Sequence, residues 1–143
     1  MDINPKYRIG IPEMDAQHAR WIHLIEVFRA AAENHLRDAS GVAAARQALH
    51  ALLEYTHSHF GSEEALLREY NYPELDDHCV MHDKLTTEIE KLFNELDTRK
   101  AAIAPLKLNL LVTVWLFEHI MEHDKAYASF LRQHVPRFAP SAA

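Results

Sequence analysis

Apolar side chains recur every three to four residues along most of this chain, as they do on the buried face of an amphipathic helix. The first such stretch predicts a helix over residues 15–37. Asp15 is its expected N-cap, because a carboxylate at that position can accept hydrogen bonds from the first backbone amides of a helix. Residues 1–14 contain two prolines and a glycine, so we expect them to form an extended arm.

Three further stretches with the same period predict three more helices. The second is expected over residues 41–69, with Ser40 as its candidate cap. The third is expected over residues 74–97, because Pro73 suits the start of a helix. The fourth is expected over residues 105–132, where a proline again opens the apolar pattern.

The four predicted helices together define the fold class. Short connections make successive helices antiparallel neighbours, so we expect an all-α fold, an up-down-up-down four-helix bundle. No repeat or second domain is visible, and we expect a single domain over residues 1–143. In this prediction the arm covers 1–14, the bundle covers 15–132 and the C-terminal tail covers 133–143, which is frayed from Val135 to Ala143.

Composition and charge narrow the classes of function. The 143 residues carry a formal net charge of −6, which disfavours a nucleic-acid partner because phosphate binding needs clustered Lys and Arg. The most apolar stretch is far shorter than the roughly 20 residues that span a bilayer, so membrane insertion is not expected. The first residues lack the apolar segment of a signal peptide, and the single cysteine, Cys79, cannot form an internal disulfide. We therefore expect a cytoplasmic protein.

Histidine is the unusual component, with eleven residues in the chain. Residues four apart share one face of a helix, and three such pairs are found on the three later helices: His59 and Glu63, His78 and His82, and His119 and His123. The first helix adds His18. Helix bundles build metal sites from side chains on facing helices, so this distribution predicts a metal centre in the core. Imidazole binds Fe, Zn, Cu and Ni, and ligand type alone does not name the metal.

Four short motifs in order resemble a known family. They are Asp15-Ala16-Gln17-His18, His59-Phe60-Gly61-Ser62-Glu63-Glu64, His78-Cys79-Val80-Met81-His82-Asp83, and the segment from Trp115 through His119 and Asp124 to Tyr127. Each motif alone is weak, but the set resembles the hemerythrins, and in particular the single-domain bacteriohemerythrins. The resemblance covers nearly the whole chain.

The resemblance implies a cofactor and its ligands. It implies two iron ions, with His78, His82 and His119 on one iron, His18 and His59 on the other, and Glu63 and Asp124 as bridges together with an oxo or hydroxo oxygen. Counting donors leaves one coordination position open on the second iron, where O2 would bind. Tyr127 is expected to hydrogen-bond close to these ligands.

Helical spacing alone does not select Asp124 as a ligand. It lies five residues after His119, about 140° around an ideal helix, whereas His123 is better placed at about 40°. Following the family pattern, we predict a local π-type widening between His119 and Asp124.

Four residues are predicted to line the O2 pocket: Trp21, Trp115, Leu116 and His123. Trp21 is bulkier than the Leu that is frequent in the family, and it would narrow access to the open iron. Two alternatives remain for His123. It either faces the pocket, where it would promote oxidation of the iron, or packs as a neutral side chain at the edge of the bundle.

The function implied by the resemblance is reversible O2 binding for storage, transport or delivery, not enzymatic turnover. With five histidines and two carboxylates, the ligand set holds fewer anionic donors than the Glu-rich ferritin-type bundles, so oxygenase chemistry is less expected. The alternatives are a di-iron enzyme that reduces peroxide, NO or O2, and an O2 or redox sensor that acts with a partner. For a carrier, an O2-consuming enzyme would be the recipient.

Overall fold

The computed structural model describes residues 4–34, 39–96 and 118–140. Its elements in those ranges are η1 (Pro5–Tyr7), α1 (Pro12–Asn34), α2 (Ala39–Glu69), α3 (Leu75–Glu95), the π-helical η4 (His119–Asp124), α5 (Lys125–His134) and η5 (Pro136–Phe138). No strand is present in these ranges. The predicted start of the fourth helix at Pro105 lies outside the described residues.

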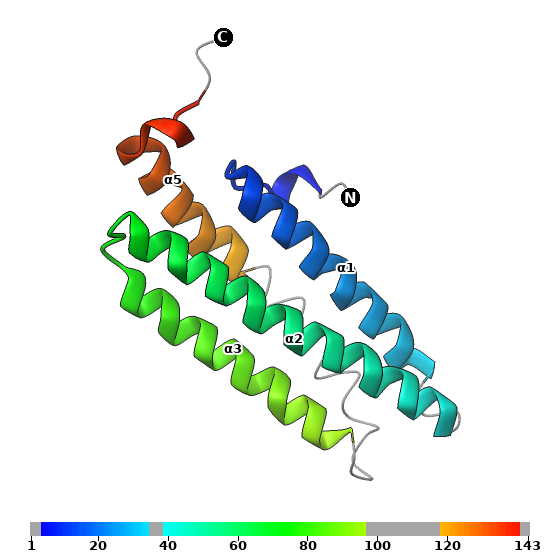
Figure 1. Ribbon diagram of the computed structural model, residues 1–143. Coiled ribbons are helices and arrows are strands. Elements are labelled where there is room, and N and C mark those ends of the chain that lie inside the picture. The colour runs from blue at the N-terminus through cyan, green and yellow to red at the C-terminus, as the bar shows by residue number, and fades with distance from the viewer. Residues whose placement is uncertain (1–3, 35–38, 97–117, 141–143) are drawn as a thin grey trace.

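The helices lie along one another as a bundle (Figure 1). α2 occupies the middle and packs against α1 on one side and α3 on the other. The segment formed by η4 and α5 runs alongside the C-terminal part of α2. The predicted all-α four-helix bundle is confirmed, and it brings side chains from every helix toward one axis.

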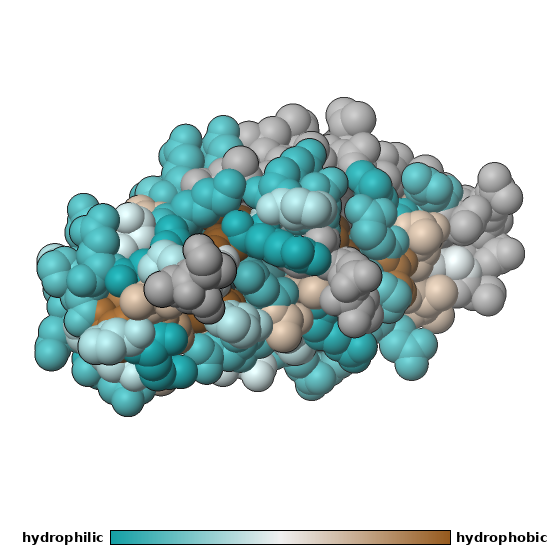
Figure 2. All heavy atoms as spheres, turned by 90° about the horizontal axis from the view of Figure 1, so that it is seen from above, coloured by the Kyte–Doolittle hydropathy of each residue, from teal (hydrophilic) through white to brown (hydrophobic). Residues whose placement is uncertain are grey.

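The core consists of the apolar positions that the helical period marks. Large side chains such as Trp21, Phe28, Leu49 and Leu131 are fully enclosed. Each contributes on the order of 2 kcal/mol through removal of apolar surface from water. Seen from above, hydrophilic side chains cover most of the described surface, with hydrophobic side chains between them (Figure 2). No helix in the described part of the chain combines the length and apolar character needed to cross a bilayer.

The start of α1 corrects two predictions. The helix begins at Pro12, because proline is well suited to a first helical turn. Asp15 therefore lies inside the helix and is not its N-cap. Its carboxylate instead accepts hydrogen bonds from the backbone amides of Ile9, at 2.8 Å, and Gly10, at 3.2 Å. These bonds fold the preceding segment back onto the helix. Within the described residues the segment before α1 contains the short helix η1, and residues 12–14, predicted as part of the arm, belong to α1.

The other helix ends differ slightly from prediction. α2 begins at Ala39, so Ser40 lies within the helix rather than before it. Beyond the end of α2, Asn71 adopts a left-handed backbone with φ of 54°, which asparagine tolerates. That turn allows the amide of Tyr72 to donate to the carbonyl of Leu67 at 2.9 Å and redirects the chain into α3.

The C-terminal tail is not frayed over residues 135–138. Phe138 is only 6% exposed, and its ring meets that of Tyr70 edge to face at 5.7 Å. The guanidinium of Arg137 donates to the Tyr70 hydroxyl at 3.0 Å. Contacts of Phe138 and Arg137 with Tyr70, just beyond the end of α2, thus hold this segment, for which the two prolines predict fraying.

Candidate metal centre

Seven polar side chains converge in the middle of the bundle. They come from all four helical segments: His18 from α1, His59 and Glu63 from α2, His78 and His82 from α3, and His119 and Asp124 from η4. None is more than 3% exposed. Burying this much polarity is costly unless each group is paired or bound to a cation, so the cluster is expected to have a specific ligand.

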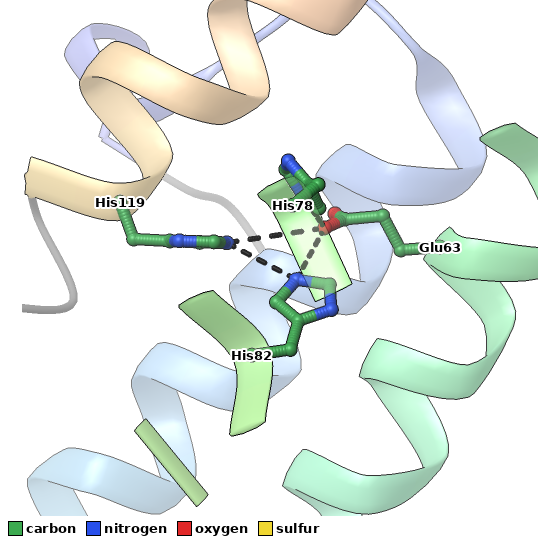
Figure 3. Close-up of side chains that lie close together, drawn as sticks. All are labelled: Glu63, His78, His82 and His119. Carbon is green, nitrogen blue, oxygen red and sulfur yellow. Dashed lines mark hydrogen bonds and ion pairs between the residues drawn. The ribbon is translucent and has the colours of Figure 1, made fainter. Parts of the chain in front are cut away.

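The first part of the cluster is the three-histidine group, formed by His78, His82 and His119 around Glu63 (Figure 3). Glu63 Oε1 lies 2.6 Å from His78 Nε2 and 2.9 Å from His82 Nε2. His119 Nε2 lies 3.1 Å from His82 Nε2 and 4.0 Å from the same Glu63 oxygen. The imidazoles on η4 and α3 therefore point toward one carboxylate oxygen on α2.

The second part is the two-histidine group, formed by His18 and His59 with Glu63 and Asp124. His18 Nε2 lies 3.0 Å from Asp124 Oδ2 and 3.5 Å from Glu63 Oε2. His59 Nε2 lies 3.6 Å from Glu63 Oε2. Here α1 and α2 supply the imidazoles.

The two carboxylates divide their oxygens between the two groups. Glu63 turns Oε1 toward the three-histidine group and Oε2 toward the two-histidine group. Asp124 does the same, with Oδ1 at 3.2 Å from His119 and Oδ2 at 3.0 Å from His18. All five imidazoles meet these oxygens through Nε2. This is an arrangement in which two carboxylates can bridge two cations.

The predicted π-type widening is confirmed, because residues His119–Asp124 form a π-helix. On a regular α-helix, residues five apart diverge by about 140°. The wider turn brings Asp124 under His119, with 3.2 Å between Oδ1 and Nε2. One turn of irregular helix therefore allows both side chains to face the cluster.

The carboxylates control the protonation of the histidines when no metal is present. Burial lowers the pKa of His18, but the close Asp124 and Glu63 carboxylates outweigh burial and raise it to about 9. Burial likewise lowers the pKa of His119, and the same two carboxylates raise it to about 10. Burial dominates at His59 and lowers its pKa to about 4. Each group thus contains one histidine that binds a proton in place of a metal.

The carboxylates themselves stay ionised. Burial raises the pKa of Asp124, as does the charge of Glu63, but His119 and His18 bring it down to about 2. At Glu63 burial also acts upward, and contacts with His119, His18 and two further imidazoles hold the pKa well below its usual value.

The donor set fits a pair of metal ions. Both Asp124 oxygens and the Nε2 atoms of His18 and His59 are buried without a well-aligned hydrogen bond. Such atoms are destabilising unless something compensates them, and a cation at each group would do so. Imidazole with carboxylate is a donor combination that iron accepts. Among the described residues, metal-binding atoms gather only in these two groups, which share Glu63.

Side chains around the cluster hold its members in position. Gln17 Oε1 accepts a hydrogen bond from His59 Nδ1 at 2.8 Å, which leaves Nε2 of that ring free to bind a metal. The Tyr127 hydroxyl donates to Glu63 Oε2 at 2.8 Å, which confirms the prediction that Tyr127 hydrogen-bonds close to the ligands. Phe60 stacks on His82 with ring centroids 3.7 Å apart.

Two residues next to the cluster, Gln17 and Thr56, have roles that the sequence does not predict. Gln17 stands out only as part of a motif, and Thr56 belongs to no motif. Thr56 is fully buried and accepts a hydrogen bond from the Trp21 indole at 2.9 Å. It lies three residues before His59 on α2, so a search for polar residues sharing the His59 face would have found it.

The structure places two of the four predicted pocket residues. Trp21 is fully buried, with its ring centroid 5.1 Å from that of His59 and 6.4 Å from that of His18. Trp115 and Leu116 lie outside the described residues.

His123 lies in a different place from Trp21. It lines a surface hollow of about 320 Å³ together with His78, and its ring centroid is 5.7 Å from that of His119. His123 is thus beside the three-histidine group. A role for it in an O2 pocket stays a prediction.

Known proteins resemble this chain over most of its length. A family model described as the hemerythrin HHE cation binding domain matches residues 9–131. A bacteriohemerythrin of Stenotrophomonas maltophilia is 32% identical over 133 residues, which cover 92% of this chain and 81% of the relative. One from Campylobacter jejuni strain 81-176 is 27% identical and covers 84% of this chain and 86% of the relative. One from Pseudomonas aeruginosa strain LESB58 is 29% identical, with 86% and 76% covered.

Proposed function

The chain belongs to the hemerythrin family, and on that premise we propose that it binds O2 reversibly at a di-iron centre formed by the three-histidine and two-histidine groups. The ligands in this proposal are those that the resemblance implied: His18, His59, Glu63, His78, His82, His119 and Asp124. Storage, transport or delivery of O2 would each use the same binding step.

One observation carries the proposal. Glu63 and Asp124 each offer one oxygen to the three-histidine group and the other to the two-histidine group. A site for a single ion would need the donors to converge on one point. Donors that separate into two groups with two shared carboxylates are what a pair of bridged ions requires.

The unequal groups determine where O2 would bind. Three imidazoles and two bridging carboxylates leave less room on one ion than two imidazoles and the same bridges leave on the other. An ion held by His18 and His59 would therefore keep the more accessible coordination position. When bound, the two irons supply the two electrons that reversible O2 binding draws on.

The surrounding side chains would keep this position dry. The indole of Trp21 covers His18 and His59. Ile120 is also fully buried, and we assign it to the general core of the bundle. Tyr127 keeps its proton, because burial and the nearby Glu63 and Asp124 charges raise its pKa well above the usual value. The tyrosine therefore acts as a hydrogen-bond donor to Glu63.

Anaerobic reconstitution with Fe(II) tests the proposal. Visible spectra are recorded before O2, after O2 and after argon purging, together with the iron content. We expect two irons per chain and an oxygen-dependent absorption band that disappears on purging. A band that decays at once and irreversibly would favour a di-iron enzyme or a redox sensor. One iron or none would contradict the di-iron centre.

Two predictions stand apart from this binding step. A cytoplasmic location rests on the sequence alone, and cell fractionation with an antibody to the chain would test it. An O2-consuming enzyme as recipient also rests on the sequence argument, and it is not needed for reversible binding.

A further inference from the structure

Trp21 and Thr56 form a hydrogen-bonded pair beside the two-histidine group. The indole Nε1–H donates to Thr56 Oγ1 at 2.9 Å, and the threonine hydroxyl donates in turn to the Leu52 carbonyl at 2.7 Å. Trp21 and Thr56 are both fully buried. The threonine oxygen thus has a defined donor and a defined acceptor, and its hydroxyl orientation is fixed.

This pair fixes the orientation of the indole ring of Trp21. The indole packs against His59, with ring centroids 5.1 Å apart, and meets Phe60 edge to face at a centroid distance of 5.2 Å. The polar edge of the indole is engaged by Thr56 and is not available to a ligand near the histidines. What faces His18 and His59 is therefore an apolar aromatic surface.

We infer that Thr56 is a positioning residue that holds Trp21 as a wall without hydrogen-bond donors over the O2 position of the two-histidine group. This inference rests on the proposed function. A hydrogen-bond donor beside bound O2 would stabilise the negative charge that forms on it and favour its loss as hydrogen peroxide. That loss would take two electrons, one from each iron, and two protons from water, and it would leave both irons ferric and unable to bind O2. By engaging the only polar atom of the indole, Thr56 opposes this loss.

The substitutions Thr56→Val and Thr56→Ser test the positioning directly. Valine has nearly the same shape as threonine but cannot accept the indole hydrogen bond, whereas serine can. In ¹⁵N-labelled metal-free protein, the Trp21 indole N–H signal is assigned by its absence in Trp21→Phe. We expect Thr56→Val to shift this signal and to speed its exchange with deuterium by at least about tenfold, because the hydrogen bond is lost. Thr56→Ser should restore slow exchange.

The consequence for O2 binding is measured as the rate of irreversible oxidation of the oxygenated iron protein. We expect Thr56→Val to raise this rate about tenfold, comparable to the effect of one buried hydrogen bond. Thr87→Val, on an exposed position of α3, is the matched control and should change it by less than about twofold.

A double substitution separates positioning from a general packing defect. In a Trp21→Phe background there is no indole N–H to engage, so Thr56→Val should raise the oxidation rate by less than about twofold. An equal effect of Thr56→Val in both backgrounds would overturn the inference, and so would an unchanged indole signal in Thr56→Val. If the parent protein does not bind O2 reversibly, the proposed function fails, while the indole signal still decides the positioning role of Thr56.

Discussion

The three-histidine and two-histidine groups share Glu63 but differ in their surroundings. In the three-histidine group, His78 lines a surface hollow with His123, and His82 Nδ1 lies 3.4 Å from Glu64, which is 24% exposed. In the two-histidine group, His18 is fully buried beside Trp21. A surface hollow thus reaches His78 in the three-histidine group, whereas the indole of Trp21 covers the two-histidine group.

This difference suggests how one bundle controls access to two similar positions. Near the hollow, three imidazoles would surround the ion. At the position proposed for O2, the fold supplies an indole whose polar edge is already engaged. Substitutions and a change of pH test this contrast, beginning with Glu63, whose two oxygens face the two groups.

Glu63→Ala should have the largest effect, because its carboxylate faces both groups. We expect affinity for iron to fall by well over 100-fold at both positions, since changes to residues behind metal ligands already cost ~10–100-fold. The metal-free protein should lose about 3–5 kcal/mol, because protonated His18 and His119 would lose a buried partner. Iron analysis and urea denaturation measure these effects. Glu54→Gln, on the exposed side of α2, is the control, and iron retained in Glu63→Ala would contradict the shared-carboxylate arrangement.

His59→Ala and His119→Ala should differ. Removing His59 leaves His18 as the single imidazole of its group, so we expect about one iron per chain and no O2 band. Removing His119 leaves two imidazoles with Glu63, and this position should keep more of its iron. Iron content and visible spectra of the two variants provide the measurement. Equal losses would mean that the two groups do not act as separate positions.

Gln17→Leu should weaken iron binding at the two-histidine group by ~10–100-fold, because it removes the acceptor that orients His59. Glu64→Leu should have the smaller effect, since its contact with His82 Nδ1 is longer, at 3.4 Å. Competition with a colorimetric chelator gives both affinities. A larger effect for Glu64→Leu would reverse the order that the structure predicts.

The metal-free protein should be most stable near pH 6.5. The raised pKa values of His18, about 9, and His119, about 10, contribute stability that is complete below 6.5 and disappears as pH rises through 9–10. The lowered pKa of His59, about 4, acts in the opposite direction as pH falls from 6.5 toward 4. We expect the thermal midpoint to fall on the order of 10 °C between pH 6.5 and 10. A flat profile over this range would contradict the proposed protonation of the two histidines.

His123→Leu should have the smallest effect. Because His123 lies beside His119 rather than beside Trp21, we expect the rate of irreversible oxidation to change by less than about twofold. Stopped-flow absorbance of the oxygenated protein measures this rate. A strong decrease would instead support the hypothesis that His123 faces the O2 pocket and promotes oxidation.

The helical period was sufficient to predict the bundle, because it depends on local apolar spacing that packing then satisfies. Its ends were less predictable. Pro12 could be assigned to an arm or to a first turn, and only the contacts of Asp15 with Ile9 and Gly10 decide between them. The docked tail likewise depends on a contact between Phe138 and Tyr70, which are far apart in the sequence.

The cluster was predictable for a different reason. Spacing of four residues marks pairs such as His78 and His82, but it would have favoured His123 over Asp124. Only the family resemblance led to Asp124 and to the π-helix that the structure contains. The Trp21 contact with Thr56 joins α1 to α2, and no periodicity within one helix predicts a contact between helices.

Anomalous X-ray scattering at the iron edge, from crystals of the iron-loaded protein, would test the account most directly. The account predicts two peaks, one beside His78, His82 and His119 and one beside His18 and His59, with Glu63 and Asp124 between them. A single peak, or two peaks within one histidine group, would contradict the division of the two carboxylates between two ions.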